Sequence, residues 1–137
     1  MYEKYFNKLR EECLIRNRSS RTADTYINNI HHFMKWTGYK PMEALSLQDA
    51  RSFILEKRNS GLSSATCNFY NSSICFLYKH VLHIPWDQDI VPRMRLDVKL
   101  PKVLSLEEIE KLINSATQIR NKAIIALLYS SGMRVGE

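Results

Sequence analysis

The chain has 137 residues, 45% hydrophobic and 10% aromatic, enough for a packed core and too apolar for a disordered segment. Lysine and arginine outnumber aspartate and glutamate by 20 to 14, a net charge of +6. Most of this excess lies in residues 1–83, which carry 12 basic and 7 acidic groups. Residues 84–104 carry 4 basic and 3 acidic groups, and residues 105–137 carry 4 of each. This distribution favours a nucleic-acid-binding surface in the first block.

Targeting features and cysteine usage indicate a cytosolic protein. The sequence has no signal-peptide pattern and no apolar run long enough to span a bilayer. Its cysteines, Cys13, Cys67 and Cys75, are an odd number without metal-ligand spacing, so we interpret them as reduced thiols. We therefore expect a cytoplasmic protein with no membrane partner and no metal.

Four helices are predicted within residues 1–83. Apolar residues recur at helical spacing from about residue 2 to residue 15, and three further helices follow the serine N-caps Ser19, Ser46 and Ser63. Gly38 and Gly61 end the second and third helices, and the fourth runs to about residue 82. Because only four glycines and four prolines punctuate the chain, the predicted fold is all-α.

The second and fourth predicted helices open with the same pattern. Ser19-Ser-Arg-Thr-Ala-Asp-Thr-Tyr26 and Ser63-Ser-Ala-Thr-Cys-Asn-Phe-Tyr70 share the form S-S-x-T-x-[DN]-x-Y. The first four positions are a common way to begin any helix, but the tyrosine also repeats at the same helical phase. We interpret the repeat as two helical hairpins packed into one four-helix domain.

Residues 84–104 are predicted to form an extended, basic connector, able to lie along a phosphate backbone. Three prolines disfavour a helix there, and basic residues alternate with apolar ones. A further helix is then capped by Ser105, and the last predicted helix runs from about residue 120 to Ser131.

The most informative stretch is the end of that last helix, which reads Ser131-Gly-Met-Arg-Val-Gly-Glu137. A glycine lets the backbone leave a helix in a left-handed conformation, and Gly132 would thereby aim Arg134. A planar guanidinium donates two parallel hydrogen bonds to the oxygens of a phosphodiester. The pattern therefore predicts a phosphate-binding arginine at position 134.

Taken in order, these motifs resemble the N-terminal half of the tyrosine recombinases, the phage-integrase family. That family carries an S-x-x-T-x-x-x-Y helix, a G-L-S-x-x-T helix, an L-P-K-x-L-S-x-E-E-hydrophobic entry to the catalytic domain, and a first catalytic-arginine box, T-G-hydrophobic-R-x-[SG]-E. Residues 19–26, 61–66, 100–109 and 131–137 match these motifs, with Ser131 where threonine is common.

The resemblance implies a domain organisation. Residues 1–83 would be an all-α, four-helix core-binding (SAM-like) domain, residues 84–104 an extended basic linker, and residues 105–137 two helices that open a truncated α/β catalytic domain. Arg134 would be the first catalytic arginine. The family's hairpin lysine, H-x-x-R box and nucleophilic tyrosine have no match in this sequence, so we expect this chain alone to be inactive.

The implied function is site-specific DNA recombination, by integration, excision or resolution, in the bacterial cytosol and nucleoid. The implied partners are double-stranded DNA and further recombinase protomers, in a tetrameric synapse of the intact protein, with no cofactor. Exposed apolar stripes on residues 105–137 also predict a dimer of the chain itself.

The predicted DNA-contacting residues lie on the polar faces of the second and fourth helices, at the end of the third, and in the connector. They are Arg18, Arg21, Thr25, Asn28, Lys35, Lys57, Arg58, Ser64, Thr66, Asn68, Asn71, Lys79, Arg93, Arg95, Lys99 and Lys102. One departure from the family stands out. Many relatives carry basic residues soon after the threonine of the fourth helix, where this chain has Phe69 and Tyr70.

Other interpretations stay open from the sequence. The pairs His31–His32 and His80–His83 could be part of a metal site, but no third ligand is apparent, and we favour solvated or phosphate-facing histidines. A helical protein–protein module would need no DNA, and a stand-alone DNA-binding regulator would need no catalysis. Heparin or duplex DNA binding at low salt separates the first of these from a recombinase segment.

Overall fold

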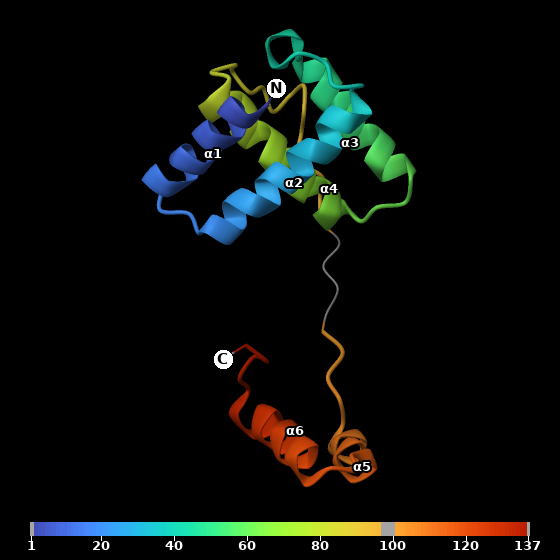
Figure 1. Ribbon diagram of the computed structural model, residues 1–137. Helices are drawn as coiled ribbons and strands as arrows, with labels where there is room; N and C mark the ends of the chain where they lie inside the picture. The colour runs from blue at the N-terminus through green and yellow to red at the C-terminus, as the bar shows by residue number, and fades with distance from the viewer. Residues whose placement is uncertain (1, 97–100, 137) are drawn as a thin grey trace. The chain divides into compact units, whose positions relative to one another are not determined.

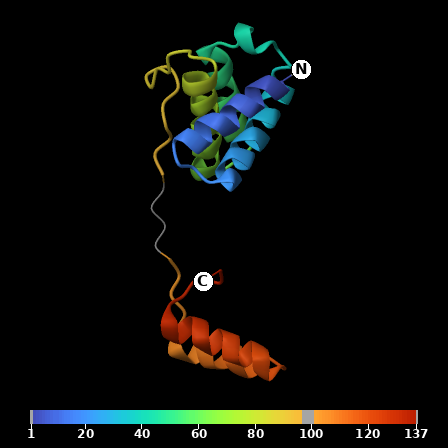
Figure 2. The same cartoon turned by 60° about the vertical axis from the view of Figure 1, so that its left-hand side comes forward.

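The structure, a computed structural model, describes residues 2–96 and 101–136 (Figures 1 and 2). The chain divides into two compact units, Met1–Asp97 and Val98–Glu137. Every regular element among the described residues is helical, so the all-α prediction is confirmed. Within this part of the chain, no helix combines the length and apolar character needed to cross a bilayer.

In its described residues, 2–96, the first unit contains four α-helices, one 3-10 turn and one π-helical turn. They are α1 (Glu3–Ile15), α2 (Ser20–Trp36), η1 (Met42–Ala44), α3 (Leu47–Asn59), α4 (Ser64–Phe76) and the π-helical η2 (Leu77–Val81), which continues α4. The limits expected from the sequence hold to within a residue or two, except that the end of the fourth helix widens into a π turn.

The repeated opening of α2 and α4 is a repeated N-cap. The Ser19 hydroxyl accepts a hydrogen bond from the backbone N–H of Thr22, and the Ser63 hydroxyl accepts one from that of Thr66. The donor–acceptor distance is 3.2 Å in each case. In each helix the serine and threonine hydroxyls also meet at 2.9 Å. Such caps satisfy amides that the helix itself leaves unpaired, which explains why the same residue types recur.

The core lies between two helical hairpins, as the repeat predicted. α1 packs on α2, α3 packs on α4, and α2 also packs against α4. Phe53 of α3 lies at the centre, with its ring 5.2 Å from Phe33, 5.6 Å from Trp36 and 5.3 Å from Tyr70 between centroids. These tilted and edge-on aromatic contacts connect α2, α3 and α4 into one core.

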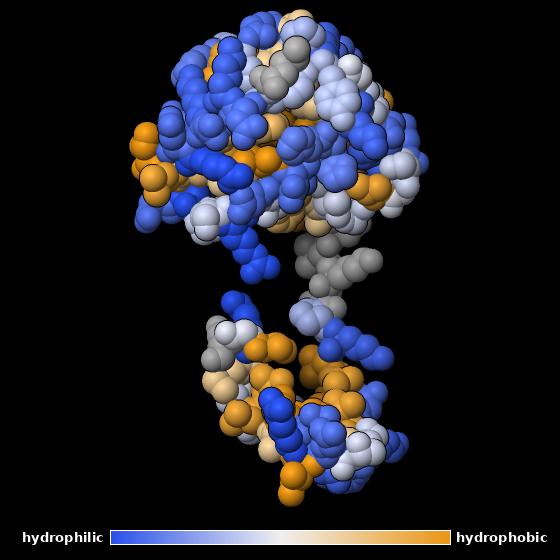
Figure 3. All heavy atoms as spheres, viewed as in Figure 1, coloured by the Kyte–Doolittle hydropathy of each residue, from blue (hydrophilic) through white to orange (hydrophobic). Residues whose placement is uncertain are grey.

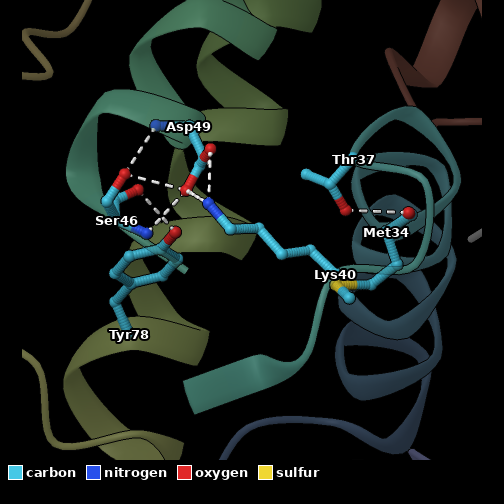
Figure 4. Close-up of polar contacts among 6 residues, drawn as sticks. All are labelled: Met34, Thr37, Lys40, Ser46, Asp49 and Tyr78. Atoms are coloured by element: carbon cyan, nitrogen blue, oxygen red, sulfur yellow. Dashed lines mark hydrogen bonds and ion pairs between the residues drawn. The ribbon is translucent and has the colours of Figure 1, made fainter. Parts of the chain in front are cut away.

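A polar network fastens the start of α3 to the rest of the unit (Figure 4). The Asp49 carboxylate accepts hydrogen bonds from the Ser46 backbone N–H over 2.7 Å and from Lys40 Nζ over 2.9 Å. The Ser46 hydroxyl accepts the Asp49 N–H in return, completing a capping box. The buried Tyr78 hydroxyl donates to the Ser46 carbonyl over 2.9 Å, so η2 is tied to the same point.

Residues 84–96 form a strap that folds back onto the helices, and the first compact unit therefore extends beyond the residue-83 boundary expected from the sequence. The Trp86 ring lies 5.5 Å from the Tyr78 ring in an edge-on contact. Val91 is only 2% exposed. The prolines did exclude a helix here, but the apolar side chains between them are used for packing.

The second unit is a hairpin of α5 (Leu106–Ser115) and α6 (Ile119–Ser131). Ser105 caps α5 in a reciprocal capping box with Glu108. Ile109 is buried at 8% exposure, whereas Leu106 and Leu127 stay 66% and 55% exposed. Much of the apolar surface of this hairpin is therefore uncovered, as the orange atoms of Figure 3 show.

Candidate nucleic-acid interface

One face of α2 carries a continuous polar stripe, which we call the α2 stripe. It consists of Arg21, Thr25, Asn28, His32 and Lys35. The spacing of four, three, four and three residues places them on one side of the helix. All are exposed except Thr25, which is half-buried and donates its hydroxyl to the Arg21 carbonyl over 2.8 Å.

The α2 stripe is held rigidly because the opposite face of the helix is the core. Ile30, Phe33 and Met34 are fully buried there. The Asn29 amide also donates to the Ser73 hydroxyl of α4 over 2.9 Å. The cations and amides of the stripe thus project from a fixed backbone, which suits the recognition of an equally regular row of phosphates.

Arg18 precedes α2 and presents its guanidinium beside the start of the stripe. Its Nη1 donates to the Tyr26 hydroxyl over 3.2 Å, and its charged carbon lies 5.5 Å from the centre of the Phe76 ring. Stacking on aromatic rings orients the guanidinium while leaving other donors outward. Arg18 itself remains exposed.

The strap occupies part of the polar face of α4 that the sequence suggested for DNA. Asn68 exchanges two hydrogen bonds with the Met94 backbone, at 2.9 and 2.8 Å. Asn71 is 3% exposed and donates to the Pro92 carbonyl over 3.1 Å. Asn71 therefore has no surface for a phosphate, and we correct its expected role to one of holding the strap.

Three of the four remaining α3 and α4 residues have local structural partners. Lys57 is half-buried with its Nζ 5.2 Å from the Phe53 ring centre, and Arg58 donates to the Leu62 carbonyl over 2.9 Å at the end of α3. Ser64 is half-buried at the first turn of α4, and Thr66 is exposed beside its N-cap. None of these contacts tests DNA binding, which stays a prediction for all four residues.

Lys79 lies on the π turn and lines a different hollow from that of Arg21, together with His83, Ile84 and Pro85. It is exposed. Its neighbour His80 accepts a hydrogen bond at Nδ1 from Arg16 Nη2 at 3.0 Å. Burial, together with the nearby Arg16 charge, lowers the pKa of His80, which favours the neutral ring.

The cations of the connector are divided between the two units. Arg93 donates to the Ser72 hydroxyl over 2.7 Å and remains exposed on the strap, as does Arg95. Lys102 is exposed before α5. The prediction for Lys99 lies outside the described residues.

A hollow of about 580 Å³ lies next to the start of the α2 stripe. Its apolar walls come from Tyr26, Phe69, Met94 and Leu96, with Arg93 at its margin. A neighbouring hollow of about 230 Å³ joins Phe69 to α2. Phe69 itself is 61% exposed.

In the second unit, the turn after α6 presents Arg134. Gly132 has φ +67°, so the predicted left-handed helix end is confirmed. The Ser131 hydroxyl donates to the Leu127 carbonyl over 2.6 Å and accepts the Met133 N–H over 3.3 Å. A serine in place of the family's common threonine thus closes the helix end with its hydroxyl, and Arg134 follows it on an exposed turn.

No three His, Cys, Asp or Glu side chains within the described residues gather in a way that could hold a metal ion. All three cysteines are free thiols, with Cys13 and Cys67 buried.

Comparison with known proteins identifies the class to which this helical unit belongs. The family model "Phage integrase, N-terminal SAM-like domain" matches residues 5–88, so the chain belongs to the phage-integrase family. The sequence-based resemblance to tyrosine recombinases is thereby confirmed.

Individual relatives carry the recombinase name. Tyrosine recombinase XerC of Bacillus subtilis is 30% identical over 134 residues, covering 89% of this chain and 44% of the relative. Tyrosine recombinase XerD of Oceanobacillus iheyensis is 28% identical, covering 98% and 48%, and tyrosine recombinase XerA of Pyrococcus horikoshii is 27% identical, covering 90% and 41%. The chain spans about half the length of the curated relatives it matches.

Two features of the candidate interface were absent from the DNA-contacting residues predicted from the sequence. His32 completes the α2 stripe, and its position three or four residues from Asn28 and Lys35 was a readable signal. The covering of α4 by the strap had no such signal, because the contacts join residues more than 20 positions apart.

Proposed function

We propose that this chain is the DNA-gripping part of a site-specific recombinase, with duplex DNA lying against the α2 stripe. The α2 stripe is the observation that carries the proposal. Arg21, Asn28 and Lys35 are exposed on one side of a helix whose other side is buried. Arg18 and Arg93 add guanidiniums in the same unit, in which residues 1–83 carry 12 basic and 7 acidic groups. Cations arranged in this way match phosphates rather than single bases.

The proposal is tested by the salt dependence of binding to duplex DNA. Neutralising Z phosphates gives a log–log slope of about −0.9Z, and three to six contacts are expected. With four contacts, affinity falls roughly 150-fold between 50 and 200 mM salt. An affinity for DNA that does not change with salt over this range excludes binding through phosphate contacts and favours a protein-interaction module.

A charge-matched pair of variants locates the surface. Arg21→Ala with Lys35→Ala removes two cations from the α2 stripe, and the slope should flatten by about 1.8. The control, Lys4→Ala with Arg10→Ala, removes two cations from α1 and should leave the slope unchanged. Equal effects of both double variants on the slope would mean that DNA binding depends on net charge alone and not on the α2 stripe.

Arg134 is proposed as the first catalytic arginine of the recombinase, donating paired hydrogen bonds to the scissile phosphate. The left-handed Gly132 turn and the Ser131 cap support this role by fixing the backbone that carries it. The family's other catalytic groups have no match in this sequence, so residues 1–137 alone should form no covalent adduct with DNA. A protein–DNA band on a denaturing gel with a nicked suicide substrate would contradict this assignment.

The α5–α6 hairpin is proposed as an assembly surface. Leu106, Leu112, Ile124 and Leu127 are 44–66% exposed there, which leaves an apolar face in water. In residues 1–137 alone, the face should be covered by a second copy, giving a dimer by light scattering. A monomer with strongly protected amides in α5 and α6 would refute this proposal.

A further inference from the structure

Phe69 is an unusual residue to find at a basic surface. It is a large apolar ring held 61% exposed on α4, a helix whose neighbouring turns are fixed by the core and by the strap. Together with Arg21, Thr22 and Thr25 it lines the smaller of the two hollows beside the α2 stripe. A ligand whose apolar group covers the ring would remove this phenyl surface from water, which is favourable.

The surroundings of Phe69 determine what that ligand is. Among the described residues, those lining the two hollows include Arg21 and Arg93 but no acidic residue. This favours an anionic partner over a cationic one. Duplex DNA is anionic throughout its backbone, yet it presents one apolar group at the edge of a base in the major groove, the C5-methyl group of thymine.

We propose that Phe69 contacts the C5-methyl group of a thymine in the major groove and so gives this surface a base preference. The inference rests on the DNA-binding function proposed above and deepens it. Arg21 and Thr25, on the facing turn of α2, hold the adjacent backbone while the ring reads the base. A phenyl ring cannot form a hydrogen bond or an ion pair with a phosphate. It therefore contributes to sequence specificity and not to the salt-dependent affinity.

The experiment first selects preferred duplexes from a random pool with residues 1–137. Each thymine of the best duplex is then replaced singly by deoxyuridine, which removes only the methyl group. Affinity is measured by fluorescence anisotropy at one fixed salt concentration. The wild-type chain should lose about fourfold at one position, the equivalent of one buried methyl group.

Variants assign that loss to the ring. Phe69→Ala should bind the thymine duplex about fourfold more weakly and show no further loss with deoxyuridine, whereas Phe69→Leu should keep part of the difference. Leu14→Ala, which removes another exposed apolar side chain (78% exposed) outside both hollows, should behave as wild type. The salt slope should be the same for all of these proteins.

Several results would overturn the inference. Selection without a preferred sequence, no deoxyuridine-sensitive position, or a Phe69→Ala variant with undiminished sensitivity would each do so while leaving the DNA-binding function intact. If Phe69→Ala changes only the oligomeric state in light scattering, the ring instead contacts a second copy of the chain. Loss of salt-dependent binding in the wild-type chain would reject the proposed function itself.

Discussion

Replacing Asp49 with alanine should destabilise the first unit in a manner that depends on pH. The Asp49 side chain is 23% exposed, and its carboxylate accepts hydrogen bonds from the Ser46 N–H, the Ser46 hydroxyl and Lys40 (Figure 4). Alanine keeps the Ser46 N-cap but removes the hydrogen bond that the Asp49 carboxylate accepts from the Ser46 N–H, which costs about 1 kcal/mol. The half-exposed ion pair with Lys40 adds at most about 1 kcal/mol. The expected total is about 2 kcal/mol at pH 7.

The pH dependence follows from the direction of the pKa shift. Burial by itself raises the pKa of Asp49, but the hydrogen bonds from Lys40 and Ser46 outweigh it and hold this pKa below its ordinary value. A lowered folded-state pKa stabilises the fold above the unfolded value of about 3.9, and the stabilisation is lost as pH falls through the folded-state pKa. The gap between wild type and Asp49→Ala should therefore narrow in acid.

Urea unfolding followed by circular dichroism at pH 7 and at pH 2.5 measures this gap. A loss of about 2 kcal/mol corresponds to a fall in Tm of about 8–16 °C for a domain of roughly 100 residues. Asp24→Ala is the matched control, since Asp24 pairs with Arg10 on the surface at 58% exposure, and it should have no measurable effect. An Asp49→Ala variant as stable as Asp24→Ala at pH 7, or equally impaired at both pH values, would refute the reasoning.

Three further outcomes are expected. Asn71→Ala should lower the free energy of unfolding by about 1–2 kcal/mol and speed protease cleavage in the strap, because it leaves the Pro92 carbonyl without its donor. The control Asn28→Ala, at an exposed position, should do neither. Gly132→Ala should destabilise the end of α6 by about 1–2 kcal/mol, because alanine is strained at φ +67°, and should increase amide exchange there. Unchanged amide exchange would show that alanine is not strained at this position. In a recombinase that contains this chain, Arg134→Lys should keep site binding but lose most strand cleavage in a gel assay, since an ammonium cannot reproduce the paired donors of a guanidinium; retained cleavage would argue against the catalytic role.

Local chemistry made most of the helices predictable. Ser19, Ser46, Ser63 and Ser105 each cap a helix with the bond expected of a serine, and Gly132 adopts the left-handed conformation that ends α6. These signals act between residues three or four positions apart, so the sequence alone contains them. The α2 stripe is also local, because it depends on the period of one helix.

Tertiary structure decided which polar side chains remain available to a partner. Asn68 and Asn71 are as polar as Asn28, and all three were expected to face DNA. The strap returns to α4 and uses the amides of Asn68 and Asn71 for its own backbone, while Asn28 stays exposed on α2. The sequence by itself determined the helices, their caps and the family. Contacts between distant segments decided which polar side chains remain available, because the backbone groups of the strap take their hydrogen-bond partners from a helix that is remote in sequence.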